Sequence, residues 1–157
     1  GGHDFAAGLS IHRENFEAFR EKFESVAEAH ITEEMFSPEI EIDRVIDFET
    51  VDFKFHNIIQ QMAPFGPQNM QPIFATLNVK NVGNTRKVGK TNNHVRFEMQ
   101  DSKGTRINGI AFGLADFVNI EELRTKPFDI CYTIQSNEFN GKINLDVIIK
   151  DVRIRES

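Results

Sequence analysis

The chain has a single cysteine, Cys131, among its 157 residues. One thiol cannot form an internal disulfide or a cysteine-based zinc site, because each needs more than one cysteine. The chain also lacks any apolar run of 18 residues and any signal-like N-terminal segment, so we expect nothing that spans or enters a membrane. These absences favour a soluble protein of a reducing compartment, the cytoplasm.

Residues arranged for metal chemistry are scarce as well. Metal-dependent phosphoester cleavage needs several carboxylates and histidines that converge on one or two ions. The only neighbouring His–Asp pair is His3-Asp4. We therefore expect no catalytic residues, no metal site and no cofactor within this chain.

Basic residues are fewer than acidic ones, 18 against 24, and the formal net charge is −6. The two signs are segregated: residues 14–52 hold 13 acidic and 3 basic side chains, whereas residues 80–106 hold 7 basic and 2 acidic. Affinity for phosphate backbones comes largely from Lys and Arg. A positive segment of this kind is what a local nucleic-acid footprint produces, although solvated surfaces also carry charge runs.

The first part of the chain predicts mixed α and β structure. Residues 9–11 are a short strand candidate, and a helix is expected from Glu14 onward. Residues 40–45 suggest a second strand, and residues 55–62 a second helix that Pro64 would end. The apolar face of the first helix comprises Phe16, Phe19, Phe23 and Val26.

Three of the five prolines lie between Pro64 and Pro72. Proline restrains the backbone, so residues 64–73 predict a stiff linker between two domains. The domains are then residues 1–63 and 74–157. We expect the second to fold without residues 1–63.

After the linker the apolar pattern changes to period two, which is typical of half-buried strands. A helical stretch at 116–123 separates the third strand from the fourth, Asn140-Gly141 suits the final hairpin turn, and a phase shift near Lys150 indicates a β-bulge. This order is the signature of a five-stranded OB-fold β-barrel. The predicted fold class is α+β, a small α/β fragment followed by that barrel. The five strands are expected around 77–79, 94–100, 106–113, 128–134 and 143–149.

An OB barrel binds nucleic acid across its second and third strands and through neighbouring loops, here 84–90 and the hairpin 136–141. The positive segment coincides with these elements, which favours single-stranded nucleic acid. Phe139 suits base stacking or packing on its own loop, and His94 suits ligand contact or plain exposure. The candidate DNA-binding residues are Lys80, Arg86, Lys87, Lys90, His94, Arg96, Arg106 and Phe139.

The N-terminal string Gly1-Gly2-His3-Asp4-Phe5-Ala6-Ala7-Gly8 is dense in glycine. Glycines let backbone N–H groups approach an anion closely, which suits phosphate binding. The same pattern also suits an ordinary turn.

Four stretches resemble a known family. Gly-Gly-His-x-x-Ala-Ala-Gly is similar to the second-domain (DHHA1-type) motif of the DHH phosphoesterase superfamily. The segment Pro64-Phe65-Gly66-Pro67-Gln68-Asn69-Met70-Gln71-Pro72-Ile73-Phe74 resembles the linker of its RecJ branch, with Gln68 where the family favours Gly and Met70 where it favours Pro. Val88-Gly89 leading to His94-Val95-Arg96-Phe97, and Ala111-Phe112-Gly113, resemble later RecJ stretches.

The resemblance implies the C-terminal part of a 5′→3′ single-stranded-DNA exonuclease of repair and recombination, in which Gly1, Gly2 and His3 contact the substrate phosphate. It places the metal-holding residues, for Mn²⁺ or Mg²⁺, in a domain outside this chain, which alone would then be inactive. Single-strand-binding protein or other repair proteins are further expected partners. Two alternatives stay open: a phosphate-binding module of an RNA or small-nucleotide phosphoesterase, and a protein-interaction OB barrel without catalysis.

Overall fold

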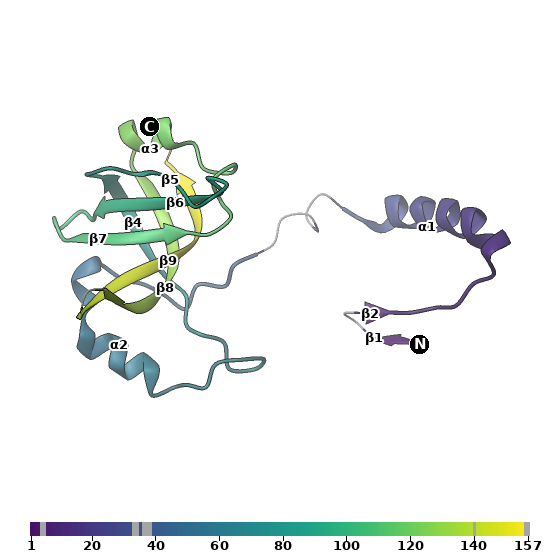
Figure 1. Ribbon diagram of the computed structural model, residues 1–157, viewed down its shortest axis with the longest axis horizontal. Helices are drawn as coiled ribbons and strands as arrows, with labels where there is room; N and C mark the ends of the chain where they lie inside the picture. The colour runs from purple at the N-terminus through teal and green to yellow at the C-terminus, as the bar shows by residue number, and fades with distance from the viewer. Residues whose placement is uncertain (4–5, 33–34, 36–38, 140, 156–157) are drawn as a thin grey trace. The chain divides into compact units, whose positions relative to one another are not determined.

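The computed structural model describes residues 1–3, 6–32, 35, 39–139 and 141–155. The chain forms two compact units, Gly1–Ile40 and Glu41–Ser157 (Figure 1). Among the described residues, no helix combines the length and the apolar character needed to cross a bilayer.

The first unit consists of a small hairpin followed by a helix. Strands β1 (Gly2–His3) and β2 (Ala6–Ala7) pair antiparallel, and a 3₁₀ turn η1 (Arg13–Asn15) leads into α1 (Phe16–His30). The predicted helix is confirmed. The predicted strand at 9–11 is wrong, because these residues pair with no strand in the described part of the chain and Leu9 is 63% exposed.

The second unit is built on a seven-stranded mixed sheet within the described residues, in the order β3-β4-β8-β9-β7-β6-β5. Strand β4 pairs with β6 as well as with β8, and the β3–β4 and β7–β9 pairs are parallel. The strands are β3 (Arg44–Val45), β4 (Phe74–Asn81), β5 (Arg86–Val88), β6 (His94–Gln100), β7 (Arg106–Ala111), β8 (Phe128–Phe139) and β9 (Lys142–Ile154).

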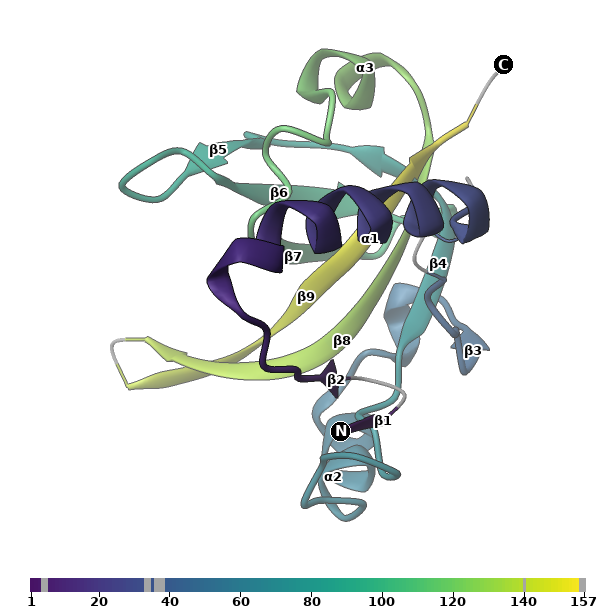
Figure 2. The same cartoon turned by 90° about the vertical axis from the view of Figure 1, so that its right-hand side faces the viewer.

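Helices cover the two ends of this sheet. The 3₁₀ turn η3 (Phe48–Thr50) and helix α2 (Phe53–Gln60) precede β4, and helix α3 (Ile120–Thr125) lies between β7 and β8. In both views α2 and α3 lie at opposite ends of the sheet (Figures 1 and 2). Asp52 caps α2, since its Oδ1 accepts the N–H of Phe55 at 2.7 Å.

The five strands expected from period two are present as β4, β6, β7, β8 and β9. The predicted bulge is confirmed: Cys131 pairs with Asp151 and Tyr132 with Ile149, which leaves Lys150 as the extra residue. Two expectations need correction. The loop expected at 84–90 contains strand β5, and the helix expected at 116–123 begins only at Ile120, after a turn.

Alternation along the strands separates the core from the surface. On β6 the side chains of Val95, Phe97 and Met99 are fully buried, while Arg96 between them is exposed. The core also holds Phe128, Ile130, Tyr132 and Ile134 of β8 and Val147 and Ile149 of β9.

Residues 41–63 pack on the sheet, whereas the sequence grouped them with the first part of the chain. Phe48 and Ile59 are only 2% and 3% exposed and belong to the same core as the strands. The stretch 64–73 therefore joins α2 to β4 within one compact unit. It contains a turn in which Gly66 and Asn69 form an isolated bridge.

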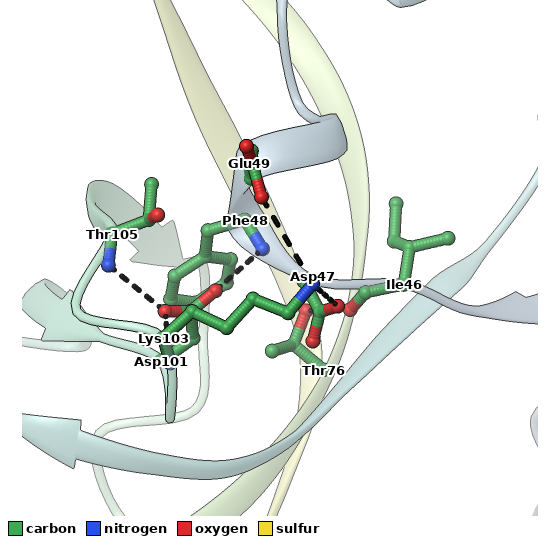
Figure 3. Close-up of polar contacts among 8 residues, drawn as sticks. All are labelled: Ile46, Asp47, Phe48, Glu49, Thr76, Asp101, Lys103 and Thr105. Carbon is green, nitrogen blue, oxygen red and sulfur yellow. Dashed lines mark hydrogen bonds and ion pairs between the residues drawn. The ribbon is translucent and has the colours of Figure 1, made fainter.

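Asp101 fastens η3 to the turn between β6 and β7 (Figure 3). Its Oδ2 accepts the N–H of Phe48 at 2.9 Å, and its Oδ1 accepts the N–H groups of Lys103 at 3.0 Å and Thr105 at 2.9 Å. Asp101 is buried, and backbone donors satisfy both oxygens of its carboxylate. This contact fixes residues 47–50 on the sheet.

Asp129 plays a similar part on β8. It accepts hydrogen bonds from Arg153, from the N–H of Asn78 in the β4 irregularity, and from Arg155. Burial alone would raise the pKa of Asp129, but the hydrogen bonds from Arg153, Asn78 and Arg155 outweigh it and hold that pKa below its ordinary value. The C-terminal end of β9 is thereby tied to β4 and β8.

Candidate nucleic-acid interface

The outward-facing side chains of β5, β6, β7 and β9 form one surface, which we call the groove face. One row of paired residues crosses this surface from strand to strand. Arg86 on β5 pairs with Arg96 on β6, and Arg96 pairs with Ile110 on β7. Ile110 in turn pairs with Ile148 on β9. Two arginines thus meet at one end of a row that becomes apolar across the sheet. This pattern follows from period two on each strand and from the strand register.

The two arginines are not neutralised by any carboxylate that the structure describes. Both are exposed, and Arg86 donates through Nη1 to the carbonyl of Asn84 at 3.2 Å. Among the residues that the structure describes, neither forms an ion pair within 4.0 Å. Like charges directly opposite on a sheet repel, so an anion between them would be stabilising.

Lys87 and Lys90 extend this positive end. Lys87 forms a surface ion pair with Asp116 at 3.5 Å, and 90% of the Asp116 side chain is exposed, so the pair is weak. Lys90 is exposed in the turn that follows β5. Lys87 pairs with the buried Val95, so its side chain leaves β5 on the other face from Arg86, and Lys90 belongs to the turn that joins β5 to β6.

His94 is held as a positioning group. Its Nδ1 accepts the N–H of Gly113 at 3.0 Å, and its ring meets Phe112 edge-on at 5.1 Å between centroids. The ring is half-buried. These contacts fix the turn after β7, on which Phe112 is 54% exposed.

Lys80 and Arg106 lie at the far end of β6. Each pairs with Gln100, from β4 and β7 respectively. Gln100 is four residues along β6 from Arg96, which corresponds to about 13 Å. The predicted residues thus fall into two groups rather than one. Lys80 and Arg106 flank Gln100, whereas Arg86, Lys87, Lys90, His94 and Arg96 lie on β5, on the start of β6 and in the turn that joins them.

Lys103, another cation of the positive segment, does not serve either group. Its Nζ lies 2.8 Å from Asp47 and 3.9 Å from Glu49 (Figure 3). The hydrogen bond and the charge of Asp47 raise the pKa of Lys103. The ammonium group of Lys103 is therefore paired with carboxylates of the same unit.

A groove of about 340 Å³ runs beside Arg96. It lies between β6–β7 and the β8–β9 hairpin, whose long arms project from the sheet (Figure 2). Amides dominate its polar lining, and Phe112, Ile110 and Ile148 supply apolar surface. The full lining is Arg96, Asn108, Gly109, Ile110, Phe112, Gln135, Ser136, Asn137, Asp146 and Ile148.

Phe112 is the residue that sequence reasoning left without a role. It follows the outward-facing Ile110 at the end of β7, so the period of two already placed it on the groove face. Its ring is half-exposed and edge-supported by His94, an arrangement that suits base stacking. The Ala111-Phe112-Gly113 stretch was the available signal.

The hairpin and the N-terminal string are less informative. The backbone of Phe139 pairs with Lys142 at the tip of the β8–β9 hairpin, whereas its side chain and Asn140 lie outside the described residues. Gly1 and Gly8 exchange backbone hydrogen bonds, and Gly2 and His3 pair with Ala7 and Ala6.

Within the described ranges, no three His, Cys, Asp or Glu side chains converge as a metal centre would require. The residues in hand therefore do not fit the Mn²⁺ or Mg²⁺ that the family resemblance implies.

Several known proteins are similar to this chain. The family profile described as the RecJ OB domain matches residues 42–151. The single-stranded-DNA-specific exonuclease RecJ of Bacillus subtilis (strain 168) is 25% identical over 158 residues, which is 99% of this chain and 20% of that protein. The protein of the same name from Salmonella typhimurium is 25% identical over 152 residues, 97% of this chain and 26% of that protein.

Solved structures show the same fold. The crystal structure of RecJ in complex with Mn²⁺ from Thermus thermophilus matches with a TM-score of 0.73 at 20% identity, over 100% of this chain and 22% of that one. A Mg²⁺ complex of RecJ from the same organism matches with the same TM-score. The chain spans about a fifth to a quarter of the length of the curated relatives.

Proposed function

Because the chain belongs to the RecJ OB domain family, we propose that it is the single-stranded-DNA-binding region of a RecJ-like 5′→3′ exonuclease of DNA repair and recombination. The observation that carries this proposal is the Arg86–Arg96 pair on neighbouring strands, of which Arg96 lines a groove together with amides and Phe112. Phosphates would lie at the arginines, and bases would lie in the groove.

The proposal also covers the shape of the sheet and the origin of the N-terminal residues. Strands β4, β6, β7, β9 and β8 form the OB barrel, a view supported by the pairing of β4 with both β6 and β8. The sequence assigns residues 1–63 to the end of a DHHA1-type domain, in which Gly1, Gly2 and His3 would contact the substrate phosphate. Only residues 1–40 form a unit apart from the sheet, so that domain would end before residue 41.

Catalysis would need residues outside this chain, where Mn²⁺ or Mg²⁺ would be held. This chain contributes the binding of the strand: cations neutralise phosphates, and aromatic rings stack on bases of any sequence. We therefore expect that it leaves labelled single strands intact in the presence of either ion.

Fluorescence anisotropy over a range of salt concentrations tests the binding function. Single-stranded DNA of several sequences should bind with similar affinities, and duplex DNA should bind more weakly, because stacking needs unpaired bases. The affinity for single strands should fall steeply as salt rises. Absence of binding at low salt, or tighter binding to duplex, would contradict the proposal, and a clear preference for RNA would favour the RNA-acting relative.

A further inference from the structure

The groove continues beyond the site described above. A second hollow of about 510 Å³ adjoins the first, and the two share Phe112, Gln135, Ser136 and Ile148 in their linings. Phe112 is thus common to both hollows. The second hollow extends from this ring toward α2, which contributes His56 and Gln60.

Lys150 brings a positive charge to the second hollow. It is the extra residue of the β9 bulge, since Ile149 pairs with Tyr132 and Asp151 with Cys131. A bulge redirects the side chains of its strand, and Lys150 lines the hollow together with Ile148. Lys150 is exposed and forms no ion pair with any residue in the described part of the chain.

Apart from Lys150 and His56, the residues that line the second hollow have no ionisable side chain. Among the described residues that line it, none is acidic, whereas the first groove includes Asp146. The α2 side is built from His56, whose Nε2 lies 3.4 Å from Gln60 Nε2, and Gln71 is anchored by its donation to the carbonyl of Ile134 at 3.2 Å. The hollow therefore offers the Lys150 ammonium in polar surroundings that do not repel an anion.

The register gives the spacing between the two cationic points. From Arg96 the row crosses Ile110 to Ile148, two strand spacings away, and Lys150 lies two residues further along β9. This separation is about 12 Å between Cα atoms. Phe112 lines both hollows between these points, as a stacking ring that separates neighbouring bases would.

We propose that the second hollow is a further nucleotide subsite, in which Lys150 binds a backbone phosphate while an adjacent base stacks on Phe112. The inference rests on the proposed function and extends it: the strand enters at Arg86 and Arg96, crosses Phe112 and runs toward α2. The footprint is then larger than the positive segment 80–106 alone.

Anisotropy with a single-stranded oligonucleotide tests this with variants of the full chain. Lys150→Gln should weaken binding about three- to tenfold and reduce the magnitude of the salt slope by about 0.7, the single-strand value for one phosphate contact. Arg96→Gln should do the same, and the double variant should lose about 1.4 in slope. Phe112→Leu should weaken binding with the slope unchanged, because stacking releases no counterions. Lys142→Gln, which removes an exposed charge of β9 outside both hollows, should leave affinity and slope as in the parent.

The outcomes separate the two proposals. A normal slope for Lys150→Gln beside a reduced slope for Arg96→Gln overturns the second subsite and leaves the binding function standing. Equal losses of affinity for Lys150→Gln and Lys142→Gln also overturn it. They would show that binding depends on the overall charge of the protein and not on a phosphate contact at Lys150. Unchanged binding by Arg96→Gln and Lys150→Gln alike contradicts the proposed function itself.

Discussion

Tyr132 is the clearest example of how one buried polar group is satisfied in this fold. Its hydroxyl lies 2.9 Å from Thr76 Oγ1, and Thr76 donates its own proton to the carbonyl of Ile46 at 2.7 Å. Thr76 has one hydroxyl proton, so Tyr132 must be the donor in their shared bond. The chain of bonds ties β4 and β8 to the segment that follows β3.

This environment predicts an unusual titration. Burial raises the pKa of Tyr132 to about 12. Since the chain has one tyrosine and no tryptophan, the near-ultraviolet absorbance of phenolate reports this side chain alone. We expect almost no phenolate in the folded protein near pH 10, where an exposed tyrosine would be half ionised.

The sign of the linked stability change follows. Below pH 10 the phenol is protonated in both states, and between pH 10 and about 12 only the unfolded chain loses the proton. The free energy of unfolding should therefore fall in this window, by at most about 1.4 kcal/mol per pH unit. Tyr132→Phe should abolish that contribution while costing about 1 kcal/mol at neutral pH. If the phenolate absorbance of the folded protein had its titration midpoint near pH 10, that result would contradict the burial of Tyr132.

Gln68 shows what the backbone demands at a single position. Its φ is 68°, in the left-handed region that side chains other than glycine rarely adopt. The family that the chain resembles favours Gly at this place, and the turn explains the preference. The sequence marked the departure, but only the structure shows its conformational consequence.

At the scale of elements, the strands that could be predicted from the sequence are those in which apolar and polar residues alternate regularly. Strands β4, β6, β7, β8 and β9 have period-two patterns, and all five were predicted. The bulge at Lys150 was also foreseen, because the apolar phase shifts there. Residues 9–11 offered too few positions to distinguish a strand from an extended segment, and no partner strand is described for them.

Elements that are stabilised by partners distant in the sequence could not be predicted from their own local sequence. Strand β5 is three residues long and carries two charges, and it exists because β6 pairs with it. Phe48 is held by Asp101, 53 residues away in the chain. The same limit applied to the site: spacing placed Arg86 and Arg96 near one binding face, but their direct pairing and the groove beside Phe112 depend on strand register.

The packing of η3 and α2 predicts where the second unit can be cut. A chain that begins at Glu41 should fold, whereas one that begins at Gln71 should be much less stable. The shorter chain loses Phe48 and Ile59, which are buried in the core. Such burial is worth about 1.5–3 kcal/mol for each side chain, against a typical total stability of roughly 5–15 kcal/mol. It also loses β3 and the partner of Asp101.

NMR dispersion and thermal unfolding of the two chains would measure this. The expected result is a well-dispersed spectrum for the chain from Glu41 and a lower melting temperature or poor dispersion for the chain from Gln71. Equal stability would mean that residues 41–63 are dispensable, as the boundary expected at 64–73 from the sequence implies.

For the whole molecule, the separation of charge carries the functional account. Net charge is −6, yet the cations that face the groove are exposed and largely unpaired among the described residues, while Lys103 is occupied by Asp47 and Glu49. A net negative protein can bind a polyanion when its cations are gathered on one face. The position of charge, rather than its sum, is therefore the property to test.

The most direct measurement compares two triple variants that remove equal charge. One, the groove-face triple, carries Arg86→Ala and Arg96→Ala on the groove face and Lys87→Ala beside Arg86 in the sequence of β5. The other, the matched triple, carries Arg13→Ala, Lys22→Ala and Lys54→Ala, which belong to η1, α1 and α2. Single-strand affinity and its salt dependence are measured by anisotropy, with circular dichroism as a check that both variants fold.

The groove-face triple should lose most of its affinity and about 2 in the magnitude of the salt slope, which corresponds to three phosphate contacts on a single strand. The matched triple should bind nearly as the parent does. If instead the groove-face triple binds the oligonucleotide as tightly as the parent at low salt, this face is not the DNA site, and a protein-interaction role for the OB domain takes its place.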